Sequence, residues 1–134
     1  MRASRFIFLL AVWGFTTCAN AQTQLEINQA AGAAHAQADK QLNEVYQRIL
    51  KEYAADPVFI ANLREAQRAW VKFRDAEMKA KYPDREAGYY GSVHPTCWAS
   101  YLAELTSQRT KDLRVWLTGI EEGDACIGSV KTKP

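Results

Sequence analysis

The chain has 134 residues, of which 17 are basic and 15 acidic, giving a formal net charge of +2. This length fits one small domain. Proteins that bind nucleic acid through a basic face need a clear excess of clustered Lys and Arg, so this composition argues against a nucleic-acid partner. It argues equally against a cationic protein that binds membrane surfaces.

The N-terminus has the features of a secretory signal peptide. Two arginines in "MRASR" (1–5) precede the uncharged apolar run "FIFLLAVWGF" (6–15), which is too short to span a bilayer. Ala19 and Ala21 suit cleavage after residue 21, with an earlier and weaker site after Gly14. We therefore expect a signal peptide over residues 1–21 and a periplasmic or secreted protein. Without Arg2 and Arg5 the chain has 15 basic and 15 acidic residues and is neutral.

A lipid anchor is not expected. The segment "FTTC", which ends at Cys18, departs from a lipoprotein signal because Phe15 and Thr17 replace the usual Leu and small residue. The mature domain is expected over residues 22–118, followed by a C-terminal tail over 119–134.

The first predicted helix runs from Thr23 to about Ala55. Apolar side chains recur there every three or four residues, which is the helical period. The expected inward stripe comprises Ala34, Ala38, Leu42, Val45, Ile49 and Tyr53, widened by Tyr46 and Leu50.

The second predicted helix runs from Pro57 to about Tyr82. Asp56 is a suitable N-cap, Pro57 suits the first helical position, and Pro83 stops the helix. Its expected inward stripe comprises Ile60, Leu63, Ala66, Gln67, Trp70, Phe73, Arg74 and Glu77.

The third predicted helix starts between Ser92 and Thr96 and ends near Gly119, a plausible C-terminal capping glycine. Its stripe comprises Tyr101, Leu102, Leu105, Arg109, Leu113 and Trp116. No stretch alternates as a strand does, and the tail is expected to be irregular unless Cys126 holds it. The sequence thus predicts an all-α bundle of three main helices.

In an exported chain the three cysteines allow one disulfide. It joins Cys97 to Cys126 or, if the signal peptide is cleaved before Cys18, Cys97 to Cys18. A metal site is not expected. His94 and Cys97 have the spacing of half a zinc site, but His35 is the only other histidine and a zinc site needs four ligands. No cofactor is expected either.

The segment "EAGYYGSVHPTC" (86–97) connects the second and third predicted helices. Gly88 and Gly91 permit backbone angles that other residues avoid, and Ser92 is a natural N-cap, so the segment serves at least as hinge and helix start. As a binding loop it would present four side chains: Tyr89, Tyr90, Ser92 and His94. Tyrosines offer rigid contact area, and the other two offer hydrogen-bond donors.

Polar side chains lie on or beside the inward helix faces, namely Asn43, Gln67, Arg74, Thr106 and Arg109. Buried amides and guanidinium groups need hydrogen-bond partners. These residues therefore form either a satisfied structural network or a polar cleft in which the two arginines anchor an anion.

The same residues carry a family resemblance. The runs "ADKQLNEVY" (38–46), "LREAQRAWVKFRDAE" (63–77) and "LTSQRTKDLR" (105–114), with "GS" at 91–92 and Cys97, resemble the LprI-type lysozyme-inhibitor family of small exported helical domains. The resemblance covers roughly residues 18–117. The matching positions are Leu42, Asn43, Tyr46, Gln67, Trp70, Arg74, Asp75, Thr106 and Arg109.

The resemblance also bears on the disulfide. The family usually has Cys at the positions of Cys18, Ala30, Met78 and Cys97, and this chain has lost the middle two. If those two positions pair in typical members, the resemblance implies Cys18 as the partner of Cys97. That pairing requires cleavage before Cys18, and Cys126 stays a competitor.

By resemblance, the protein would bind and inhibit lysozyme in the periplasm, with the loop inserted between the two carboxylates of the lysozyme cleft. The alternative is an envelope protein-interaction domain with another partner. An enzyme is not expected. Ser92 and His94 are neighbours without an orienting acid, and Arg74 would lower rather than raise the pKa of a nearby Asp75 or Glu77 carboxyl.

Overall fold

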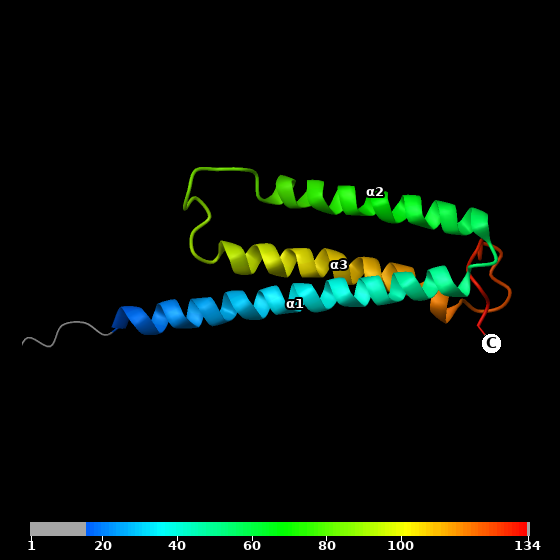
Figure 1. Ribbon diagram of the computed structural model, residues 1–134, viewed down its shortest axis with the longest axis horizontal. Coiled ribbons are helices and arrows are strands. Elements are labelled where there is room, and N and C mark those ends of the chain that lie inside the picture. The colour runs from blue at the N-terminus through cyan, green and yellow to red at the C-terminus, as the bar shows by residue number, and fades with distance from the viewer. Residues whose placement is uncertain (1–15, 134) are drawn as a thin grey trace, which may run out of the picture.

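The computed structural model describes residues 16–133, with side chains from residue 23 onward. The fold consists of three helices, α1 (Thr16–Glu52), α2 (Pro57–Lys81) and α3 (His94–Thr118). Helices α1 and α3 run side by side in the same direction, and α2 returns antiparallel to both (Figure 1). The all-α prediction is confirmed for residues 16–133, where no strand occurs. The predicted signal peptide lies outside the described side chains.

The helix boundaries follow from local signals. At the start of α2 the Asp56 carboxylate accepts a hydrogen bond from the Phe59 N–H at 2.9 Å, and Pro57 occupies the first helical position. The helix ends at Lys81 with Tyr82 as its C-cap, immediately before Pro83 and within one residue of the predicted end. Helix α3 begins after Val93, which makes no side-chain capping bond, so the expectation of Ser92 as N-cap is wrong.

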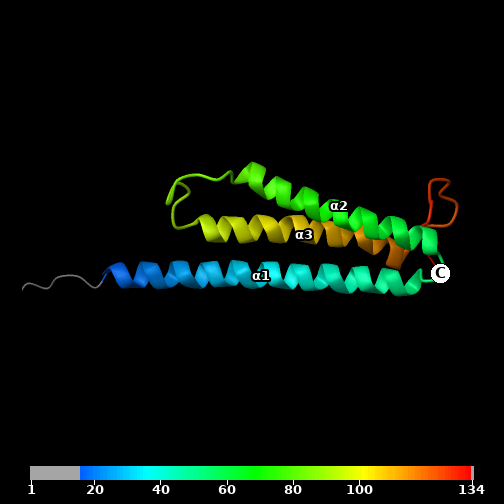
Figure 2. The same ribbon diagram turned by 45° about the horizontal axis from the view of Figure 1, so that its top comes forward.

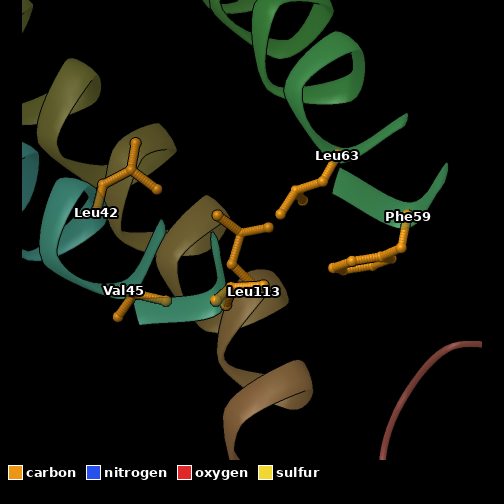
Figure 3. Close-up of a cluster of buried hydrophobic side chains, with 6 residues drawn as sticks. Leu42, Val45, Phe59, Leu63 and Leu113 are labelled. Carbon is orange, nitrogen blue, oxygen red and sulfur yellow. The ribbon is translucent and has the colours of Figure 1, made fainter. Parts of the chain in front are cut away.

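The main contact of the bundle joins α1 to α3, while α2 packs less closely and diverges from them toward its C-terminal end (Figure 2). The hydrophobic core lies at the opposite end, where α1 finishes and α2 begins. Figure 3 shows side chains from all three helices meeting there. The buried residues of this cluster are Leu42, Val45, Ile49, Phe59, Leu63 and Leu113.

Three residues expected on inward stripes are exposed: Ala34, Ala66 and Phe73. Phe73 retains 55% of its accessible surface. At about 100° per residue, Phe73 lies roughly 80° around α2 from the buried Leu63. Because α2 contacts its neighbours over a narrow strip, a side chain that far from the centre of the strip remains in solvent.

The predicted disulfide between Cys97 and Cys126 is absent, and both thiols are free. Cys97 lies in the first turn of α3 and Cys126 in the tail beyond the other end of that helix. The intervening part of α3 is about 30 Å long at 1.5 Å per residue, whereas a disulfide joins Cα atoms about 4.4–6.8 Å apart. The alternative partner, Cys18, has a side chain outside the described residues.

The C-terminal tail is irregular, as predicted, but hydrogen bonds rather than Cys126 hold it. Ile120 forms an isolated bridge with Thr132. The Lys131 N–H donates to the Tyr53 hydroxyl at 3.2 Å, and that hydroxyl donates to the Trp116 carbonyl at 2.9 Å. Tyr53 thereby joins the end of α1 to the end of α3 and to the tail.

No helix within residues 16–133 combines the length and the apolar character needed to cross a membrane.

Candidate functional site

The connection between α2 and α3 is built on a cluster of aromatic rings. Tyr82 lies with its ring centroid 5.7 Å from Tyr90, 5.1 Å from His94 and 5.6 Å from Trp98. Tyr90 stacks on His94 at 4.7 Å. These rings come from the end of α2, the loop and the first turns of α3, so they fix the loop to the helices that flank it.

The four loop residues predicted to bind a partner divide into two pairs. Tyr90 is half-buried, and its hydroxyl donates to the Pro83 carbonyl at 2.7 Å. His94 is also half-buried, and its Nε2 atom is buried with no hydrogen-bond partner among the described residues. Tyr89 and Ser92 are exposed, Tyr89 to 61% of its surface. The outer pair, Tyr89 and Ser92, can therefore reach a partner, while the inner pair, Tyr90 and His94, supports the loop.

Arg85 joins the outer pair, and sequence reasoning missed it. Its guanidinium carbon lies 5.7 Å from the centroid of the Tyr89 ring, a cation–π contact. Both side chains are exposed, and Arg85 forms no ion pair with any described residue. The only sequence signal for it was its position in the loop beside Pro83 and Asp84.

A cavity of about 280 Å³ lies beneath the loop, lined by Tyr82, residues 83–91, His94 and Trp98. Burial is the main reason that the pKa of Tyr82 is raised, with smaller contributions from Cys97 and Tyr90. Within residues 23–133 no group of three or more His, Cys, Asp and Glu side chains is placed to hold a metal ion.

The motif residues of α2 and α3 form a second polar and aromatic group. The Trp70 ring has the Arg74 guanidinium carbon 5.4 Å and the Arg109 guanidinium carbon 6.0 Å from its centroid. Arg109 donates from Nε to the Gln67 side-chain oxygen at 3.1 Å, and Arg74 pairs with Asp75 at 2.9 Å. The structure therefore brings these five residues together on the α2–α3 contact.

The other motif residues are placed separately. Leu42 and Thr106 are buried, and Tyr46 packs against the core. Thr106 donates its hydroxyl proton to the Leu102 carbonyl at 2.8 Å, which satisfies a buried polar group within its own helix. Asn43 was expected on or beside an inward face and is exposed, where it donates to the Asp39 carboxylate at 3.2 Å.

Sequence reasoning also missed polar contacts that surround the loop end. The Tyr101 hydroxyl donates to the Glu77 carboxylate at 2.9 Å, and the Lys81 ammonium lies 3.2 Å from the Tyr101 ring centroid. The hydrogen bond to Glu77 is the main reason that the pKa of Tyr101 is raised. On α1, Asn28 accepts a hydrogen bond from Thr96 of α3.

Comparison with known proteins gives a family match and one relative. The family model described as "Lysozyme inhibitor LprI" matches residues 17–113. A protein of Rhizobium meliloti (strain 1021), described as uncharacterized, is 28% identical over 118 residues, which covers 78% of this chain and 81% of the relative. No solved structure matches the chain.

Proposed function

Because this chain belongs to the LprI lysozyme-inhibitor family, we propose that it binds lysozyme in the periplasm and inhibits it through the outer side of the loop between α2 and α3. The observation that carries the proposal is the pair Arg85 and Tyr89. This pair is exposed at one end of the bundle, at the surface of a loop that packed aromatic rings hold in place.

The chemistry of the pair suits the proposed target. Lysozyme cleaves glycosidic bonds with two carboxyl groups in a cleft. The Arg85 guanidinium can donate two parallel hydrogen bonds to a carboxylate, and the Tyr89 hydroxyl and Ser92 hydroxyl add further donors. A loop that is already ordered loses little conformational entropy on binding, which favours affinity.

Affinity would come from these contacts rather than from long-range attraction. The predicted mature chain is neutral, so it lacks the net charge that would attract a strongly charged partner over long distances. We therefore expect the association rate with lysozyme to change little between low and physiological salt.

The test is a muramidase assay with several types of lysozyme and increasing amounts of the purified mature protein. We expect saturable inhibition of at least one type. Tyr89→Ala and Arg85→Gln should each weaken inhibition by about tenfold, because each removes exposed interface contacts, while the melting temperature stays unchanged. The matched controls are Phe73→Ala and Arg68→Gln, which alter an exposed aromatic and an exposed arginine on α2.

Two contrary results would test the binding element and the partner separately. Inhibition that survives Tyr89→Ala and Arg85→Gln but disappears in Phe73→Ala would overturn the loop as the binding element and assign binding to α2. Failure to inhibit any lysozyme type would overturn lysozyme as the partner.

A second candidate function is an envelope protein-interaction domain without catalytic activity and with a different partner. Leu25 and Ile27 favour it, because these apolar side chains of α1 keep 56% and 50% of their surface. They lie between Gln24 and Asn28, whose side chains hydrogen-bond to Thr96 in the first turn of α3. Capture of an envelope protein that is lost in Leu25→Ser, with lysozyme activity unaffected, would support this candidate.

A further inference from the structure

A second cavity lies at the end of the bundle opposite the loop. Its volume is about 450 Å³, within the range of small-molecule sites. Its apolar wall is formed by Phe59, Leu63 and Ala66 of α2 and by Leu113 and Trp116 of α3. Figure 3 shows Leu63, Phe59 and Leu113 close together at this end of the molecule.

One residue that lines this cavity has a guanidinium group without a carboxylate partner among the described residues. Arg109 lines the cavity and is partly buried. Its Nε atom is bonded to Gln67, and its terminal nitrogens make no hydrogen bond or ion pair with any described residue. Burial lowers the pKa of Arg109, and nearby Asp112 opposes that shift, but the Asp112 carboxylate accepts its hydrogen bond from Gln108. The group thus carries a partly desolvated charge.

The other polar residues that line the cavity are Asp56, Asn62 and Ser129. The Asp56 carboxylate accepts from the Phe59 N–H at the start of α2, and the Ser129 hydroxyl accepts from the Trp116 indole N–H at 3.1 Å. Asp56 is the one acidic residue among those that line the cavity, and its charge would repel a second negative group on a ligand.

We propose that this cavity binds a monocarboxylate with an apolar body, such as a medium-chain fatty acid. The carboxylate pairs with the two terminal nitrogens of Arg109, a geometry that guanidinium groups favour. The apolar body lies against Phe59, Leu113 and Trp116, which removes its surface from water. Asp56 selects against ligands with two charges. This site is independent of the proposed lysozyme contact, because it lies at the other end of the helices.

The experiment titrates the purified protein with decanoate below its critical micelle concentration, followed by calorimetry and by tryptophan fluorescence, since Trp116 lines the cavity. Three further ligands separate the contributions: acetate lacks the apolar body, decan-1-ol lacks the charge, and decanedioate has a second charge. We expect saturable binding of decanoate, about tenfold weaker binding of decan-1-ol and decanedioate, and no binding of acetate.

Variants test whether binding occurs in this cavity. Arg109→Gln should weaken decanoate about tenfold and leave decan-1-ol unchanged, whereas Arg114→Gln, an exposed arginine on the same helix, should change neither. Ala66→Trp keeps Arg109 and its partners but fills the cavity from its exposed rim, so it should abolish binding of both. Absence of decanoate binding, or equal binding in Ala66→Trp and the unaltered protein, would overturn the proposal.

Discussion

Trp70 shows how much one side chain contributes where α2 meets α3. It is half-buried, packs against the core cluster and has two guanidinium groups near its ring. Truncation removes apolar burial and two cation–π contacts. We expect Trp70→Ala to lower the free energy of unfolding by about 2 kcal/mol, less than for a fully buried Trp. Urea denaturation followed by circular dichroism measures this change.

Phe73 supplies the matched control on the same helix. Because its side chain is 55% exposed, Phe73→Ala should change the free energy of unfolding by less than about 0.5 kcal/mol. Similar losses for the two variants would mean that α2 is rotated about its axis relative to the arrangement described above.

The sequence predicts correctly which single residues are buried where a neighbouring helix covers the whole apolar face. Leu42, Val45 and Ile49 were expected inside and are buried, because α3 covers that face of α1 along much of its length. Ala66 and Phe73 were expected inside and are exposed. Periodicity gives the centre of an apolar stripe, but its width depends on how closely the neighbouring helix packs, and α2 packs loosely.

At the scale of elements, Gly119 ends α3 and lets the chain turn into the tail. Its φ of 76° and ψ of 173° lie in a region available almost only to glycine. A Cβ atom there would approach the Lys131 carbonyl oxygen to 2.8 Å. We therefore expect Gly119→Ala to destabilise the protein by about 1–3 kcal/mol, measured as a change in the free energy of unfolding.

Gly32 provides the opposite case within α1. A Cβ atom at this position meets nothing within 4 Å, and the residue is exposed in the interior of a helix. Gly32→Ala should therefore stabilise the protein by up to about 1 kcal/mol. If both glycine variants destabilised the protein equally, the assignment of Gly119 as the special position would be wrong.

The helix ends were predictable because each depends on a few adjacent residues. Asp56 with Pro57, Pro83, and Gly119 mark boundaries that the structure confirms. The loop site was only partly predictable. Tyr89 and Tyr90 are sequence neighbours with opposite roles, and contacts of Tyr90 with Tyr82 and His94, which no local pattern shows, hold Tyr90 on the inner side. The Arg109 cavity depends on α2, α3 and the tail together, and no local pattern indicates it.

At the scale of the whole molecule, the free thiols and the predicted signal peptide together give a prediction. We expect cleavage after Ala21, so the mature chain begins at Gln22 and retains Cys97 and Cys126. Alkylation of the denatured, unreduced protein should add two groups, because the length of α3 keeps these thiols apart. Intact-mass spectrometry reads the N-terminus and the number of alkyl groups together.

A different mass would identify an earlier cleavage site and a disulfide. A mature chain that retains Cys18 and takes up one alkyl group would mean that cleavage occurs earlier and that two of the three cysteines are joined. Reduction before alkylation would then add the two missing groups.

The parallel arrangement of α1 and α3 has a consequence for how the chain folds. Thr96 contacts Asn28 across 68 residues of sequence, and Lys131 reaches Tyr53 across 78. Helical bundles of local hairpins fold fast because their contacts are close in sequence, whereas distant contacts slow folding. Here α1 acquires its main partner only when α3 is available, late in synthesis. We therefore expect a nascent chain of this design to remain without its core until most of it has been made, which is the condition in which a polypeptide can be threaded through an export channel.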